Sequence, residues 1–441
     1  MMTKSSVPTT SQIQPEPTPV DNAEWRRRLP ERILMWLPLS LFFPIGFMYA
    51  GILSFYLALV MSGDWRTKIN NIRCNPMLLP ILALSLVSIV IAMTQDKPAE
   101  IAQEFWPGFG HYQTYLFLLP YLSVSAGDWQ RKALLIFFAG AVVASSLFVA
   151  NALHLLPDNT LFHSYVHYLG NKSILLGMLL AIASGWMLHE LRLRQDHRWL
   201  RILVLLYVIG ALILLSKTRT ASLMFMLMCG LMLMRNFDWS WRSLILPVVM
   251  ASALVGGWKY AVNLPPPATC VINAAHAAPW EVIKIRAVCS IQQVRDFSAG
   301  RKMGEDGMRL EIYKITADMI AEQPWIGHGI ASWMPNYQRR SQGLISNSMT
   351  TPHNDYLLYA TELGMAGVLA LISIWVMQLR TAYQMARSHD IMDRERAMLL
   401  TMLTVAMMLG GMFNAILRDA VFGMALMILL AIPLAGARKS A

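Results

Sequence analysis

The stretch TTPHNDYLLYATELGMAG, residues 350–367, opens a long apolar segment. Thr351 is a residue type that caps helix N-termini, and Pro352 suits a first helical position. The pattern therefore predicts that a membrane-spanning helix begins here, with His353 and Asn354 in its first turn. A helix N-terminus attracts anions and disfavours a charged imidazole. His353 is thus a candidate general base beside an anion site, the alternative being a histidine that only solvates the helix end.

Composition excludes an ordinary soluble protein. Of the 441 residues, 56% are hydrophobic and 14% are charged, and the mean hydropathy is +0.44. The net charge of +11 arises from basic residues that gather between apolar runs. That placement is typical of cytoplasmic loops and not of a nucleic-acid-binding surface. We therefore expect an all-α polytopic membrane protein, surrounded by membrane lipids, with no nucleic acid as a partner.

Apolar runs of about 20 residues, the length of one membrane crossing, give about twelve candidate spans. They lie near residues 33–47, 48–62, 77–94, 111–127, 131–153, 171–190, 200–216, 220–235, 243–261, 353–379, 396–413 and 419–436. The first two are interrupted only by Pro44 and Gly46, and reading them as one span would invert everything downstream.

The distribution of basic residues favours two spans there. With a cytoplasmic N-terminus, five short loops assigned to the inside carry fifteen arginines and lysines, whereas the short loops assigned to the outside carry five. The positive-inside rule supports this topology. The chain then divides into a disordered cytoplasmic tail (1–30), nine spans (31–261), an outer loop (262–352), and three spans with a short cytoplasmic tail (353–441).

The outer loop, between spans nine and ten, faces the periplasm in this topology. It is predicted to contain two helices, near 279–297 and 305–323, the second followed by Pro324 and a glycine-containing turn. Cys270 and Cys289 both fall in this loop and could form a disulfide in an oxidising compartment, whereas Cys74 falls in a cytoplasmic loop.

Two arginines are candidates for an anion site on the outer side. Arg219, with Lys217, lies in a very short outer turn, where two cations suggest an anionic ligand or contact with lipid phosphates. Arg309 begins the second outer-loop helix, whose apolar residues fall on one face, so it is either a ligand or a surface arginine. Guanidinium groups bind phosphate bidentately, so both arginines could hold a diphosphate near His353.

Secondary candidates on the same side are Asn354, Arg418, Asp419 and Lys172. Glu362 lies on the opposite helix face from His353 and is interpreted as structural. We find no set of ligands with convincing metal-binding spacing, and we assign neither a metal nor a cofactor.

These segments resemble the bacterial O-antigen ligases and their relatives, the O-antigen polymerases and O-linking oligosaccharyltransferases. The resemblance rests on PHNDYLLYATELGMAG (352–367), on MRLEIYKITADMIAEQPWIGHG (308–329) and on TRTA (218–221), and it covers roughly residues 200–436. It implies metal-independent transfer of a glycan from undecaprenyl diphosphate on the periplasmic side of the inner membrane. By position, Arg219 and Arg309 would hold the diphosphate and His353 would act at the acceptor hydroxyl.

Within this family we favour the ligase, which transfers undecaprenyl diphosphate-linked O-antigen to lipid A-core. A single large outer loop favours it, because the family's polymerases usually carry two and its oligosaccharyltransferases a longer C-terminal part. A polymerase or oligosaccharyltransferase is the alternative. A non-catalytic transporter of lipid-linked glycans is a more distant one, since it would place paired charges in mid-membrane.

Overall fold

The computed structural model describes residues 22–96, 99–153, 155, 171–215, 219–235 and 305–438, and scattered positions between 252 and 293. Every regular element within these residues is a helix, as predicted. The predicted span 243–261, most of the predicted helix 279–297 and the tail 1–21 lie outside the described residues.

The described helices follow one another along the chain from Asn22 to Leu434. In order they are α1 (Asn22–Trp36), η1 (Leu37–Phe42), α2 (Ile45–Met61), α3 (Trp65–Cys74), α4 (Leu78–Thr94), α5 (Ala99–Tyr112), η2 (Thr114–Phe117), α6 (Leu118–Leu122), α7 (Trp129–Ala152), α9 (Asn171–Leu193), α10 (Arg198–Gly210), η3 (Ala211–Leu215), α11 (Arg219–Arg235), α14 (Glu305–Glu322), α15 (Trp333–Arg340), η4 (Ile345–Ser348), α16 (Asp355–Ala386), α17 (Ile391–Phe413) and α18 (Ala420–Leu434).

Four of the described helices, α7, α9, α16 and α17, contain stretches that are long and apolar enough to cross a membrane. The pair α2 and α3, bent by 118°, would make a fifth, and α4, α18 and part of α11 are shorter apolar helices. The protein is therefore a multi-pass membrane protein. By length and composition the described residues support four or five spans, and the expected twelve are not confirmed.

Three local expectations are wrong. Helix α1 already begins at Asn22, inside the predicted disordered tail, and a Glu24–Arg28 ion pair of 2.6 Å joins its successive turns. The boundary between the first two predicted spans lies at Pro44, which is the N-cap of α2. The segment 111–127 is not one helix, because the end of α5, η2 and α6 divide it.

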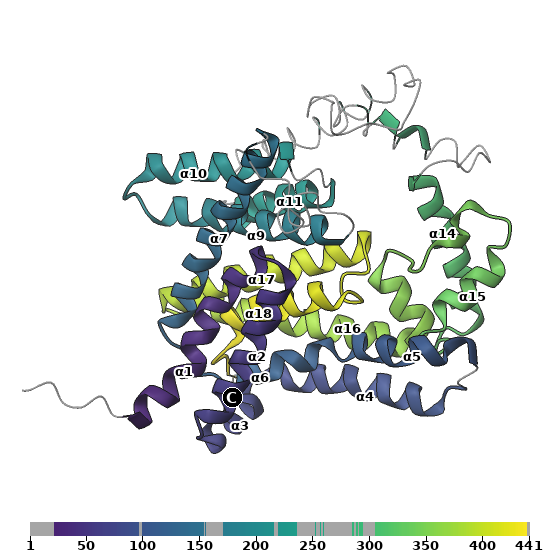
Figure 1. The fold of residues 1–441 in the computed structure, drawn as a ribbon, viewed down its shortest axis with the longest axis horizontal. Helices are drawn as coiled ribbons and strands as arrows, with labels where there is room; N and C mark the ends of the chain where they lie inside the picture. Colours follow the sequence, from purple (N-terminus) through teal and green to yellow (C-terminus); the bar gives the residue numbers. More distant parts are fainter. Residues whose placement is uncertain are drawn as a thin grey trace, which may run out of the picture.

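Helices α16, α17 and α18 form the centre of the molecule (Figure 1). Helix α16 packs against α17 and α4, and α11 packs against α9. Helices α14 and α15 belong to the segment predicted to be the outer loop (262–352), a name kept below, and they cover the N-terminal part of α16 (Figure 1). They do so through a small apolar cluster in which Ile312 and Met319 of α14 are fully buried.

Helix α16 is broken at Gly364, where φ is 65° and ψ is −165°. The break leaves backbone groups that the turn after α14 satisfies. His328 N and Gly329 N donate to the carbonyls of Thr361 (2.7 Å) and Glu362 (3.0 Å). Met365 N donates to Pro324 O at 2.8 Å. The two glycine-containing motifs of the sequence therefore form one junction, which fixes the outer loop on α16.

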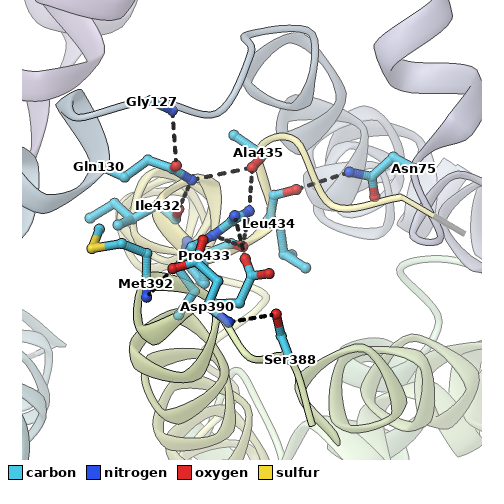
Figure 2. Close-up of polar contacts among 12 residues, drawn as sticks. Asn75, Gly127, Gln130, Ser388, Asp390, Met392, Ile432, Pro433, Leu434 and Ala435 are labelled. Atoms are coloured by element: carbon cyan, nitrogen blue, oxygen red, sulfur yellow. Dashed lines mark hydrogen bonds and ion pairs between the residues drawn. The ribbon is translucent and has the colours of Figure 1, made fainter. Parts of the chain in front are cut away.

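The opposite end of the core is fixed by side chains that bind the last carbonyls of α18, which have no partners within their own helix. Figure 2 shows Gln130 donating to the carbonyls of Ile432 and Ala435, and Asn75 donating to that of Leu434. Arg396 donates to the carbonyls of Pro433 and Ala435. A cation at a helix C-terminus is also favoured by the helix dipole.

Candidate functional site

His353 does not lie within a helix. Helix α16 begins at Asp355, and its N-cap is Asn354, whose side-chain oxygen accepts from Leu357 N at 3.0 Å. The expected cap, Thr351, instead accepts a hydrogen bond from His353 N at 2.9 Å. This contact accompanies a left-handed backbone at His353, with φ of 49°. Such backbones are uncommon for non-glycine residues and cluster at active sites.

The imidazole of His353 is oriented by Asn414. Its Nδ1 lies 3.2 Å from Asn414 Oδ1, and an amide oxygen can only accept. With the Asn414 amide in this orientation, Nδ1 is the protonated nitrogen of the neutral ring, and Nε2 carries the lone pair. Asn414 is only 8% exposed, so this contact is sheltered from water. Asn414 was missed in the sequence because it lies 61 residues away from the histidine.

The surroundings of the His353 imidazole favour its neutral form. Burial lowers the pKa of His353 below the ordinary value of 6.5. The positive charges of Arg309 and Arg418 lower it further, whereas the hydrogen bond with Asn414 opposes them. A neutral histidine with Nε2 as its acceptor nitrogen can remove a proton from a hydroxyl group.

The connection between α17 and α18 gathers the site residues. The last carbonyls of α17 have no hydrogen-bond donors within their own helix. Side chains of the candidate site donate to them instead. Asn354 Nδ2 donates to Met412 O at 3.0 Å, and Arg309 donates to Phe413 O at 3.0 Å. Arg309, from the outer loop, is thereby brought beside the residue that orients His353.

Arg418 and Asp419, at the end of this connection, have different partners. Arg418 donates to the carbonyl of Thr350, just before His353. Asp419 is the N-cap of α18 and accepts from Val421 N (2.9 Å) and Phe422 N (3.3 Å). Arg418 therefore belongs to the surroundings of His353, whereas the carboxylate of Asp419 stabilises a helix start.

Arg219 is placed by its backbone only. Arg219 begins α11, and Met224 follows five residues later in the same helix. Met224 lies beside Gly410, near the end of α17, because a Cβ added at Gly410 would be 3.1 Å from Met224 Cε. At 1.5 Å per residue, the start of α11 is about 8 Å further along the helix axis. The side chains of Arg219 and Lys172 lie outside the described part of the structure, and so does Lys217.

The predicted disulfide between Cys270 and Cys289 can be compared with the structure only in part. Cys74 carries a free thiol, and so does Cys229. Cys289 is 4% exposed and disulfide-bonded. Its expected partner, Cys270, lies outside the described residues, so the pairing stays a prediction.

Glu362 is a buried connector. Its carboxylate accepts from Tyr112 Oη (2.6 Å), Ala331 N (3.1 Å) and Trp333 N (3.2 Å). It thus joins α16 to α5 and to the turn before α15, in keeping with its interpretation as structural.

A small pocket, partly open to solvent, lies between α5, the turn before α15 and the start of α16. Glu104 and His111 of α5 line it together with Thr350 and Arg418. The sequence did not reveal these α5 residues, because α5 was expected to be a loop leading into a span. No metal-binding group of three or more His, Cys, Asp or Glu side chains occurs among the described residues.

Residues 202–372 match the family described as O-Antigen ligase. This match supports membership of the O-antigen ligase/polymerase superfamily. The match contains Arg219, Arg309 and His353, and it ends before the α17–α18 connection that supplies Asn414 and Arg418. No curated protein matches the chain.

Proposed function

We propose that the protein is an O-antigen ligase that transfers O-antigen from undecaprenyl diphosphate to lipid A-core on the periplasmic side of the inner membrane. The observation that carries this proposal is the hydrogen bond between His353 Nδ1 and Asn414 Oδ1. Because Nδ1 binds Asn414, the basic Nε2 of the neutral imidazole faces away from Asn414. The superfamily supplies the reaction class, a transfer of glycan from a lipid-linked donor.

The proposed reaction needs one base and one anion site. Nε2 of His353 takes the proton of the acceptor hydroxyl, whose oxygen forms the new bond to the anomeric carbon. The bond between that carbon and the diphosphate breaks, and the diphosphate leaves with both electrons. Attack opposite the leaving group inverts the anomeric configuration, and a product with retained configuration would count against this mechanism.

The diphosphate is assigned to the arginines. The Arg309 guanidinium binds a carbonyl of α17 through one nitrogen, Nη1, and it has further N–H groups. Guanidinium groups suit phosphate oxygens, because two parallel hydrogen bonds accompany the charge attraction. Arg219, at the start of α11, is proposed as the second ligand, with Lys217 beside it.

Deletion of the gene distinguishes the ligase from the polymerase. We expect cells without the protein to make lipid A-core that lacks O-chains, while polymerised glycan accumulates on undecaprenyl diphosphate. Lipopolysaccharide analysis by gel and mass spectrometry would measure both products. Core that carries a single repeat unit would instead identify a polymerase, and restoration by a His353→Ala gene would exclude a catalytic histidine.

A further inference from the structure

The pocket beside α5 adjoins the candidate catalytic residue. Thr350 and Arg418 form part of its lining and are themselves hydrogen-bonded to each other. Thr350 lies three residues before His353, and the charge of Arg418 acts on the His353 imidazole. A ligand in this pocket would therefore extend to the surroundings of His353.

The wall of the pocket is held by hydrogen bonds and ring stacking within the protein. Ala331 lines it with a left-handed backbone, φ 62°, and its N–H is held by the buried Glu362. Trp333 stacks on Tyr337 with ring centroids 4.6 Å apart, and its indole N–H donates to Thr316 Oγ1 at 3.1 Å. A rigid wall lowers the entropy cost of binding.

Helix α5 forms the second wall of the pocket, and Gly108 lets it approach the turn at Ile330 and Ala331 closely. A Cβ at Gly108 of α5 would lie 3.3 Å from the Cβ of Ala331 and 3.3 Å from a methyl carbon of Ile330. Gln95, near the end of α4, closes the same junction, because its side chain accepts from Ile330 N (2.6 Å) and donates to Ile330 O (3.1 Å). The position of α5, and with it Glu104, is thus fixed relative to the turn.

The lining suits a neutral polyhydroxyl compound. Glu104 offers an exposed carboxylate as acceptor, Arg418 offers donors, and His111 and the Thr350 hydroxyl can each do either. Leu358 and Met334 add apolar surface. Sugar hydroxyls donate and accept, and sugar rings present apolar faces, so they match this mixture. For a phosphate, the repulsion by Glu104 would offset the attraction of Arg418.

The two arginines around His353 suggest which sugar binds here. Arg309 approaches His353 from the outer loop and is assigned to the donor diphosphate, and it does not line the pocket. Arg418 does line it. Since the acceptor must approach opposite the leaving diphosphate, we propose that this pocket binds the terminal sugar ring of the acceptor, with Glu104 as a hydrogen-bond acceptor. This inference rests on the proposed function.

Binding of lipid A-core to the full-length protein in nanodiscs tests the pocket without requiring turnover. We expect Glu104→Ala to weaken this binding about ten-fold, the lower end of the cost of losing a charge-assisted hydrogen bond. Glu104→Gln should recover part of the loss, because its amide oxygen still accepts. Free core oligosaccharide, released from lipid A, should compete with lipid A-core for the wild-type protein, since the sugar is what the pocket recognises.

Asp318→Ala is the matched control, because it removes one exposed carboxylate from α14, which carries Arg309, away from the pocket. It should leave binding unchanged, and thermal unfolding should show all variants folded. Unchanged affinity in Glu104→Ala, or weakened binding of the diphosphate donor instead, would overturn the assignment, and so would a wild-type protein that does not bind lipid A-core. A wild-type protein that binds lipid A-core and transfers nothing to it would instead contradict the proposed function.

Discussion

At the scale of single residues, the proposed mechanism assigns charge and proton transfer to different side chains. Arg309 brings a permanent positive charge to the end of α17, and His353 brings a neutral imidazole fixed by Asn414. These are different tasks, so their removal should have different kinetic consequences.

We expect Arg309→Ala to weaken binding of the undecaprenyl diphosphate donor roughly ten- to a hundred-fold, because charge-assisted hydrogen bonds are lost. Arg219→Ala should behave alike, and lysine should rescue only partly, since it lacks the bidentate fork. His353→Ala should lower turnover by about 10²–10⁴ and leave donor affinity nearly intact. Donor binding and transfer to lipid A-core by purified variants measure both effects.

The pH dependence of the transfer rate tests separately whether His353 acts as the base. Because burial lowers the pKa of His353 below 6.5, the wild-type rate should stay level down to that lowered pKa. It should fall only as the imidazole becomes protonated at more acid pH. The residual rate of His353→Ala should lack this acid limb. If His353→Ala loses donor affinity as severely as Arg219→Ala, the histidine belongs to the anion site instead.

The sequence predicts which charged or titratable residues belong to the site better than it predicts the residues that they contact. An arginine in a short outer turn or a histidine before a span is visible, because it violates the local pattern. Asn414 and Glu104 violate no pattern, and their roles follow from packing between segments far apart in the chain. Thr351 is a third case: it satisfies the capping rule, yet Asn354 is the actual cap.

At the scale of elements, the break in α16 decides where His353 lies. The helix continues from Met365 to Ala386 after the break, which at 1.5 Å per residue is about 33 Å and enough to cross the hydrocarbon core. The part before the break, Asp355–Leu363, is then an additional segment at the membrane boundary. His353 precedes that segment, so we expect the site to lie at the membrane surface, beneath the outer loop.

Gly364→Ala should loosen this junction. The backbone at Gly364 occupies a region that is essentially restricted to glycine, where another residue costs about 1–3 kcal/mol. In addition, an added Cβ would lie 2.4 Å from the carbonyl carbon of Trp325. We expect a lower thermal unfolding midpoint and faster tryptic cleavage in α15, which carries Arg339 and Arg340.

Gly110→Ala provides the comparison, since Gly110 is helical and a Cβ added there would meet no atom within 4 Å. Equal stability of the two variants would mean that the junction does not hold the outer loop.

The helices themselves follow from apolar runs and stop signals, and the ends of α4, α11 and α17 lie close to the predicted ones. The break could not be predicted, because it depends on a turn some 35 residues earlier that replaces the missing helical hydrogen bonds.

At the scale of the whole molecule, the remaining question is which end of the core faces the periplasm. His353, Arg309 and the pocket lie at the end where α16 starts, and Arg396, at the other end, binds the carbonyls that terminate α18. Charge bias assigns this second end to the cytoplasm. The assignment depends on the segment around Pro44, because one crossing there instead of two reverses the whole chain.

Two single cysteines on either side of α16 settle this orientation. Gln342 and His389 are both exposed, and the residues between them include the whole of α16. In a Cys74→Ser, Cys229→Ser background, Gln342→Cys should react with a membrane-impermeant maleimide in intact spheroplasts. His389→Cys should react only after permeabilisation, because its loop carries the cytoplasmic excess of arginines. The reverse labelling pattern would place His353 in the cytoplasm, where the proposed transfer to lipid A-core could not take place.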